Sequence, residues 1–450
     1  MLIAGFQGFL VIWVVMLALV YGLSGRFIGV TLFFAATTTL YVLLPNQFFP
    51  SDADLFGLLL STVVLGILGF YVGLTAFSGL SERRLFAGLP PRADLDKIAR
   101  AAVVLLTLAL GTLFVLRPDF IVYLGTYQGR VDFSGNYGPL VFLLNQGVIA
   151  IAILIIWAYR HQRFVLAFAL SAIEVFWAVY SSAKISLLAV SAAWLAIALF
   201  ANWKNRVRNW IMIFSIGILL PCSLLIMMTY AVLRSGITDP DLALTLLANN
   251  LDRLGSAGVD VGDFSGPYWV FTQHLRNDFL DLTLGSTYIE QLLVLIPRVL
   301  RGEFLDLTDA FAKEQYGAAY LPGLGFAFSP WAEGYMNFRV AGAFVQGLLF
   351  GLFSRYLLTS TVRLIGLNEI ALFFQIFLIT YFERNHFVGQ IKATIVYCLP
   401  FLVTWAALEL VMRRPMSHLQ TALAASTVGK IGAAIGRANR TIGQESTHPR

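Results

Sequence analysis

Charged side chains are scarce in this chain, and their scarcity excludes most soluble folds. Only 12% of the 450 residues are charged, whereas 58% are hydrophobic. The hydrophobic residues fall into repeated blocks of about 20, the length that crosses a hydrocarbon core of about 30 Å. These blocks differ from the alternating segments of about 10 residues that build transmembrane barrels. We therefore expect an all-α protein that crosses a membrane many times.

Cysteine is also nearly absent: the two residues, Cys222 and Cys398, both lie inside hydrophobic blocks. Their number and spacing give neither a disulfide framework nor a zinc site. The sequence has no P-loop, no H-E-x-x-H and no G-x-S-x-G segment, which disfavours ATP hydrolysis, zinc proteolysis and the usual serine-hydrolase elbow. We expect no metal and no cofactor.

The hydrophobic blocks predict eleven spans with a long loop between the eighth and the ninth. They cover about residues 5–23, 27–45, 55–77, 101–116, 140–158, 164–180, 185–200, 210–233, 340–358, 370–382 and 393–412. Residues 1–233 then hold spans one to eight, residues 234–329 form the loop, and residues 330–412 hold the last three spans. We expect the loop to fold as a cap, with short apolar segments such as L-L-V-L-I-P along the membrane interface. Residues 413–450 form a basic tail.

The distribution of lysine and arginine predicts the orientation. One set of connections, together with the tail, holds 19 of the 31 basic residues. The alternate set holds the other 12, together with 18 of the 25 acids. Because basic residues concentrate in cytoplasmic connections, the first set is expected inside, which leaves the N-terminus and the long loop outside. The net charge of +6 then reflects topology, and no nucleic-acid partner is expected.

The stretch 320–358 carries the densest group of polar and aromatic residues. A glycine-rich turn leads to Ser329 and Pro330, where serine can cap the free N–H groups and proline suits the first helical position. We expect one helix that begins in water at Ser329 and continues into the bilayer as far as Phe353. Its first turns carry Trp331, Glu333, Tyr335, Asn337 and Arg339.

Glu333 and Asn337 are four residues apart and therefore share one face of this helix. A carboxylate at the membrane surface has a raised pKa through desolvation, unless a neighbouring arginine offsets that effect. Such a group suits a general base, or a group that orients a hydroxyl. The alternative is a structural hydrogen bond between the two residues at the helix entry.

Small residues recur every four positions on the ninth predicted span, at Ala343, Gly347 and Gly351. Such a stripe lets two helix backbones approach closely, so we expect another helix to pack tightly against this face. Gln346 lies on the same span, and we expect it to hydrogen-bond between helices, as we expect of Gln146 and Gln375 on two other predicted spans.

Basic residues in the external connections form a second group of candidates. Guanidinium groups bind phosphate in a bidentate manner and stay charged in poorly hydrated places. The alternative is that they reach the membrane interface or form salt bridges at the ends of spans. The candidates are Arg130, Lys184, Arg276, Arg298 and Arg384, and His386, one of the two histidines expected outside, is a further candidate.

The stretch 320–358 resembles the O-antigen and oligosaccharide repeat-unit polymerases of the Wzy type. The family tends to show a glycine-rich turn, then S-P-x-x-E-x-Y-x-N-F, then a glycine-rich span, and residues 329–338 match that pattern. The I-P-R at 296–298 and the arginine at Arg384 also resemble family features. The family usually has glycine after N-F, where this chain has Arg339.

The resemblance implies a GT-C-like, metal-independent glycosyltransferase of the bacterial inner membrane. It would join oligosaccharide units carried on undecaprenyl diphosphate at the periplasmic face, with a chain-length regulator as a further candidate partner. Arg298 and Arg384 would bind the diphosphate, and Glu333 would act as base or orient the acceptor. The candidate substrate contacts are Arg130, Lys184, Arg276, Trp331, Tyr335, Asn337, Arg339 and His386.

Two other functions remain open from the sequence. An O-antigen ligase, which moves a finished glycan to the lipid A core, shares the many spans and the long outer loop. The S-P-x-x-E-x-Y-x-N-F segment favours the polymerase. A transporter or flippase is the other alternative, but charge within the spans is scarce apart from Glu174, and inspection shows no inverted repeat.

Overall fold

The computed structural model describes about half of the chain and shows it as helical. It describes residues 27–43, 45, 53–75, 95–121, 138–181, 184–200, 262–277, 283–296, 307–316, 328–365 and 367–411. All regular structure within these ranges is helix, in agreement with the predicted fold class. The elements are α2 (Phe27–Val42), α4 (Ala53–Thr75), α6 (Leu95–Leu116), α9 (Gly138–Arg160), α10 (Phe164–Ser181), α11 (Lys184–Phe200), α14 (Gly262–Asn277), α15 (Ser286–Glu290), the 3₁₀ helix η2 (Gln291–Leu295), α17 (Leu307–Tyr316), α18 (Pro330–Phe338), α19 (Val340–Ile365), α20 (Asn368–Phe382) and α21 (Phe387–Tyr397).

Five helical stretches are long and apolar enough to cross a membrane. They are Asp54–Thr75, Leu95–Leu116, Leu140–Arg160, Val340–Ile365 and Phe387–Val411. Three shorter apolar helices, Phe164–Ala178, Ile185–Ile197 and Glu369–Phe382, coincide with further predicted spans. The predicted spans 5–23 and 210–233 lie outside the described residues, so the count of eleven stays a prediction. The described part of the chain is all-helical and suited to a lipid bilayer.

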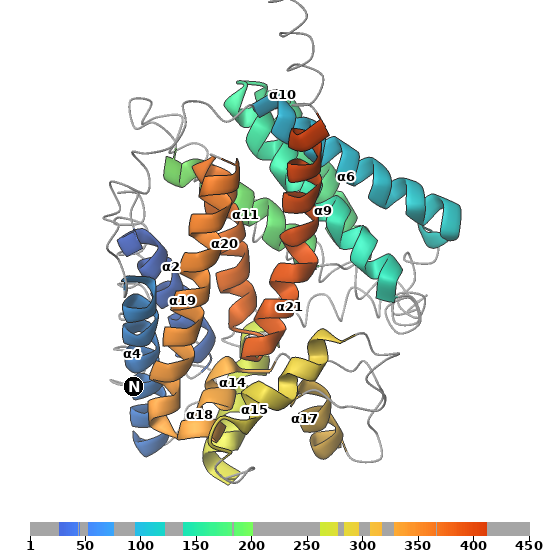
Figure 1. The fold of residues 1–450 in the computed structure, drawn as a ribbon. Coiled ribbons are helices and arrows are strands. Elements are labelled where there is room, and N and C mark those ends of the chain that lie inside the picture. The colour runs from blue at the N-terminus through green and yellow to red at the C-terminus, as the bar shows by residue number, and fades with distance from the viewer. Residues whose placement is uncertain are drawn as a thin grey trace, which may run out of the picture.

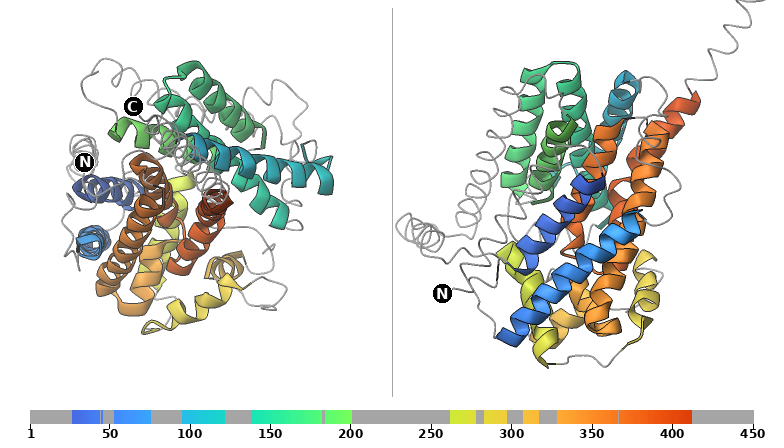
Figure 2. Two further views of the ribbon diagram at one scale, coloured as in Figure 1. Left: turned by 45° about the horizontal axis from the view of Figure 1, so that its top comes forward. Right: turned by 90° about the vertical axis from the view of Figure 1, so that its left-hand side faces the viewer.

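The helices form a bundle with a group of short helices at one end. α4 and α19 run side by side, α20 and α21 occupy the middle, and α6, α9, α10 and α11 lie on the far side (Figure 1). The short helices α14, α15, α17 and α18 gather at the end where α19 begins, as the side view of Figure 2 also shows. That end carries most of the candidate residues from the stretch 320–358.

α4 and α19 pack with their backbones in close contact, which confirms the prediction from the small-residue stripe. A Cβ atom added at Gly347 would lie 2.1 Å from the carbonyl oxygen of Gly66, and one at Gly351 would lie 2.3 Å from that of Phe70. No side chain fits at either separation. Glycine is therefore required on α19 because the backbone of α4 occupies the space that a side chain would need.

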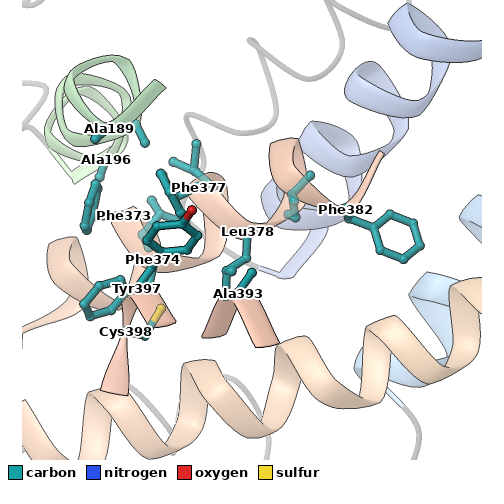
Figure 3. Packing of buried hydrophobic residues seen from close by; sticks show 14 of the residues in the cluster. Ala189, Ala196, Phe373, Phe374, Phe377, Leu378, Phe382, Ala393, Tyr397 and Cys398 are labelled. Carbon is teal, nitrogen blue, oxygen red and sulfur yellow. The ribbon is translucent and has the colours of Figure 1, made fainter. Parts of the chain in front are cut away.

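Aromatic packing holds the hairpin of α20 and α21 in place. The ring centroids of Phe377 and Tyr397 lie 5.2 Å apart in an edge-to-face arrangement. Small residues of α11, including Ala189 and Ala196, lie close to the phenylalanines of α20 (Figure 3). This packing fixes the turn at 383–386, which contributes directly to the candidate site.

Two ion pairs join helices at the opposite end of the bundle. Arg160 Nη2 lies 2.7 Å from Glu369 Oε1, and Lys97 Nζ lies 3.3 Å from Glu409 Oε2. α19 leads from α18, among the short helices, to the start of α20 at the other end of the bundle. The two ion pairs are therefore separated from the short helices by the length of one span. The sequence predicts this end to be cytoplasmic.

The expected single helix from Ser329 to Phe353 is interrupted at Arg339. α18 ends at Phe338, and Arg339 adopts φ 53° and ψ −142°, a conformation that cannot continue a helix. α19 then begins at Val340 and packs against α18. The two helices touch at glycine: a Cβ atom on Gly342 would lie 1.7 Å from the oxygen of Gly334. The prediction of one continuous helix was therefore wrong.

Candidate functional site

α18 begins as the sequence predicts but is buried where exposure to water was expected. Ser329 occupies the N-cap position with an extended backbone, and Pro330 follows at the first helical position. The Ser329 side chain makes no capping hydrogen bond, contrary to expectation. Trp331, Glu333 and Asn337 are all buried, because α18 is enclosed by α14, α15 and α19. The expectation that this turn is a water-exposed cluster was wrong.

The Glu333 side chain is fully buried and bonded through one oxygen only. Its Oε2 accepts hydrogen bonds from the Phe387 backbone N–H at 2.6 Å and from Gln346 Nε2 at 3.0 Å. Its Oε1 has no hydrogen-bond partner among the described residues. Burial raises the pKa of Glu333 to about 7, although the two donors counteract part of that rise. A buried carboxyl with one free oxygen and a pKa near neutrality can exchange a proton.

Gln346 connects Glu333 to a tyrosine on α15. The Tyr288 hydroxyl donates to Gln346 Oε1, and the Gln346 amide donates to Glu333 Oε2. The amide orientation is therefore fixed at both ends. Burial and the nearby Glu333 raise the pKa of Tyr288, so its hydroxyl stays protonated and acts as a donor. The prediction of hydrogen bonds between helices is confirmed for Gln346 and for Gln146, whose Nε2 donates to the Val396 carbonyl. It is wrong for Gln375, whose side chain has no hydrogen-bond partner among the described residues.

Asn337 ties the segment before α15 to α18 and uses its full hydrogen-bonding capacity. Its Oδ1 accepts from Thr283 Oγ1 at 2.7 Å and from the Gly285 N–H at 2.8 Å. Its Nδ2 donates to Thr287 Oγ1 at 2.6 Å and to the Glu333 carbonyl at 2.8 Å. The last bond is the structural i,i+4 hydrogen bond that the sequence left as the alternative, made here to the backbone of Glu333.

A second buried carboxyl, Glu383, lies at the same end of the bundle and was not predicted. Trp331 Nε1 donates to Glu383 Oε2 at 2.8 Å, and Thr38 Oγ1 donates to Oε1. Burial raises the pKa of Glu383, just beyond the last residue of α20, to about 8. Glu383 thereby joins α2, α18 and α20. The only signal in the sequence was an acid beside Arg384 at the end of a predicted span.

The indole of Trp331 fits against a glycine of α4. A Cβ atom on Gly66 would lie 2.5 Å from the indole ring, so the absence of a side chain at Gly66 makes room for it. Phe34 and Phe382 complete the surroundings, with ring centroids 6.2 Å and 5.6 Å from that of Trp331. Trp331 is therefore enclosed by protein in this structure.

Other predicted residues lie around this buried centre. The Arg339 guanidinium lies 5.3 Å from the ring centroid of Tyr335, and both side chains are partly exposed. Arg384 is partly exposed in the turn that also contains Glu383. His386 is the N-cap of α21, where its Nδ1 accepts from the Gly389 N–H at 3.2 Å. The turn therefore brings Arg384 and His386 near the Phe387 N–H that binds Glu333.

The remaining predicted residues are away from the centre or cannot be placed. Arg276 is exposed in the last turn of α14. Lys184 is the first residue of α11, and its side chain lies outside the described part of the chain. Arg130 and Arg298 also fall outside it, so their predicted roles stay predictions. Within the described ranges, no three or more His, Cys, Asp or Glu residues are grouped to hold a metal ion.

Comparison with known proteins adds no assignment to this geometry. The chain matches no protein-family model, no curated protein and no solved structure.

Proposed function

We propose that the protein is a membrane glycosyltransferase that polymerises oligosaccharide units carried on undecaprenyl diphosphate. The observation that carries the proposal is Glu333, a buried carboxyl that has a pKa of about 7 and one oxygen without a hydrogen-bond partner in the part of the chain that the structure describes. The resemblance of residues 329–338 to repeat-unit polymerases supports it. In this proposal the protein lies in the bacterial inner membrane and the site faces the periplasm, with the N-terminus outside and the C-terminus in the cytoplasm.

The proposed reaction needs charge stabilisation and one proton acceptor. A hydroxyl oxygen at the nonreducing end of the incoming unit attacks the anomeric carbon of the growing chain. The bond between that carbon and the diphosphate oxygen breaks, and undecaprenyl diphosphate leaves with the electron pair. The hydroxyl proton passes to the unbonded Oε1 of Glu333. Diphosphate is a good leaving group, so it needs positive charge rather than an acid catalyst.

The arginines are the proposed source of that positive charge. Arg384 follows the buried Glu383 and lies three residues before Phe387, whose N–H binds Glu333, and this position in the chain supports its proposed role. Arg298 is the second proposed diphosphate ligand on the strength of the resemblance alone. Tyr335 and Arg339, both partly exposed, are the proposed sugar contacts.

Other residues of the stretch are assigned to positioning. Trp331 donates to Glu383, and Asn337 has four hydrogen bonds to protein atoms. With their polar atoms engaged and their side chains buried, both hold α18 in position rather than contact sugar in this conformation. The lipid-linked oligosaccharide and the bilayer are the proposed partners, together with a chain-length regulator protein.

Deleting the gene and separating the surface glycan on a gel tests the proposal against its alternatives. Loss of a polymerase leaves single units attached to the lipid A core. Loss of a ligase leaves long chains on the lipid carrier and none on the core, whereas loss of a flippase traps single units inside the cell. The proposal predicts the first pattern, and either of the other two contradicts it.

A further inference from the structure

The segment from Leu284 to Ile296, which contains α15 and η2, has the opposite polarity to a helix on a water-exposed surface. Its apolar side chains point outward: Leu284 and Ile289 are each 71% exposed. Its polar side chains point inward, with Thr287 and Gln291 buried. The exposed set is completed by Leu292, Leu293, Leu295 and Ile296. A helix that borders water shows the reverse arrangement.

The inward polar groups all have partners in the protein. Thr287 Oγ1 accepts from Asn337, and Gln291 Oε1 accepts from the Leu307 N–H at 3.3 Å. The exposed side chains are hydrocarbon apart from Glu290, the one charged residue between Thr283 and Ile296. Whatever covers this face must therefore be apolar over most of its area.

The segment adjoins a candidate membrane span. η2 packs against α21, and the Tyr288 ring lies edge-on to the ring of Phe387, the first residue of the span Phe387–Val411, with centroids 6.1 Å apart. Further along that span, Ile395, Leu399 and Val403 are exposed as a lipid-facing surface requires. The segment thus borders a helix that is itself a candidate membrane span with apolar side chains exposed.

We propose that the segment Leu284–Ile296 lies in the bilayer interface, with its exposed leucine and isoleucine side chains among the acyl chains. At 13 residues it is too short to span the membrane, but its apolar face suits shallow burial. The segment also bonds to α18 through Asn337 and to Gln346 through Tyr288. Its depth in the leaflet therefore sets the depth of the buried Glu333. This proposal does not depend on the reaction that Glu333 carries out.

Spin-label accessibility in a lipid nanodisc tests the proposal. A nitroxide is attached to Ile289→Cys, Leu292→Cys or Leu295→Cys in a background with Cys222→Ala and Cys398→Ala, in nanodiscs of phosphatidylethanolamine and phosphatidylglycerol. Power saturation then compares collisions with oxygen, which concentrates in acyl chains, and with a water-soluble nickel chelate. Phe176→Cys on α10 is the lipid-exposed control, and Glu314→Cys on α17 is the water-exposed control.

We expect the three segment positions to resemble the Phe176 control, with oxygen collisions several-fold above those at the Glu314 control and nickel collisions several-fold below. A pattern like that of the Glu314 control would place the face in water and overturn the proposal. Low accessibility to both reagents would show that protein covers the face, which would also overturn it. Leu284→Cys replaces any position whose label changes the thermal stability. The readout is independent of glycan synthesis, so the proposed function can fail while this proposal stands.

Discussion

Glu333 and Glu383, the two buried carboxyls at the candidate site, differ in their hydrogen bonding, which favours a chemical role for one and a structural role for the other. Both Glu383 oxygens accept hydrogen bonds, one from Thr38 and one from Trp331. Among the described residues, Glu333 receives two donors on Oε2, whereas Oε1 has no hydrogen-bond partner. A buried acceptor without a donor costs roughly 1–3 kcal/mol, so it is a group that a substrate hydroxyl can satisfy. Glu333 therefore suits chemistry, and Glu383 suits a structural junction.

Replacing Glu383 with glutamine should weaken the pH dependence of stability. The Glu383 carboxyl has a folded pKa of about 8 against 4.5 for the free side chain. The folded state therefore holds a proton that the unfolded state releases, and the resulting stability is present below pH 4.5 and lost as pH rises to about 8. The melting temperature of the wild type, followed from pH 5 to 9, should fall more than that of Glu383→Gln.

Glu383→Ala is the matched control for that experiment. This substitution removes the acceptor of the Trp331 N–H and of the Thr38 hydroxyl. It should therefore lower the free energy of unfolding by roughly 2–4 kcal/mol at every pH. Wild type and Glu383→Gln curves that fall in parallel would show that the Glu383 carboxyl does not titrate in this range.

The sequence made Glu333 a candidate but did not indicate Glu383, for a physical reason. The environment of Glu333 is partly local, because its helix start and the S-P-x-x-E pattern are contiguous in the chain. The partners of Glu383 are Trp331 and Thr38, and the latter is 345 residues away in the sequence. Similarly, no local pattern indicates that the Phe387 N–H would reach Glu333.

At the scale of elements, Arg339 determines how α18 meets α19. Its φ of 53° with ψ of −142° lies in a region that only glycine adopts without strain, at a cost of roughly 1–3 kcal/mol for other residues. Residues 335–341 contain neither proline nor glycine, so the sequence pattern predicts no break in the helix at Arg339. The glycine usual in the resembled family at this position fits the conformation that the chain adopts.

Arg339→Gly should therefore raise stability by about 1 kcal/mol. The relief of backbone strain exceeds the loss of the contact with Tyr335, worth roughly 0.5–1 kcal/mol. Arg339→Ala is the control, since it loses the same contact but keeps the strain, and should lower stability. Thermal unfolding in detergent measures both. If glycine destabilised as much as alanine, the strain at Arg339 would be negligible.

Gly347→Ala should force α4 and α19 apart and lower the free energy of unfolding by roughly 1–3 kcal/mol. Its Cβ would lie 2.1 Å from the Gly66 oxygen and 2.9 Å from the Phe70 nitrogen, and neither backbone atom can yield without moving a helix. Gly57→Ala on α4 is the control, because nothing lies within 4 Å of its added Cβ. That variant should gain up to about 1 kcal/mol from helix propensity.

The comparison is read from the unfolding midpoints of the two variants in the same detergent. Equal effects of the two substitutions would show that the close contact of α4 with α19 does not exist in the membrane protein.

The close packing itself was predictable from the stripe of Ala343, Gly347 and Gly351, but the identity of the partner helix was not, because α4 is remote in the sequence.

At the scale of the whole molecule, the two ends of the bundle differ in chemistry. One end has two ion pairs between helices: Arg160–Glu369, in which an exposed arginine meets a buried carboxylate, and the partly buried Lys97–Glu409. The other end has a fully buried network around Glu333 and Glu383, covered by the short helices (Figure 1). Charge counting predicts the first end to be cytoplasmic and the second external. The class of all-helical membrane protein follows from composition, while the arrangement of remote helices around Glu333 needs the folded structure.

The most direct test of the account is the rate of polymerisation by purified protein in nanodiscs, supplied with undecaprenyl-diphosphate-linked oligosaccharide across pH 5 to 9. The wild-type rate should rise as pH passes about 7, where Glu333 loses its proton. Glu333→Gln keeps an acceptor for the Phe387 N–H but cannot take a proton, and should be slower by roughly 100-fold or more, without that rise. A Glu333→Gln protein that makes long chains at the wild-type rate would contradict the central claim.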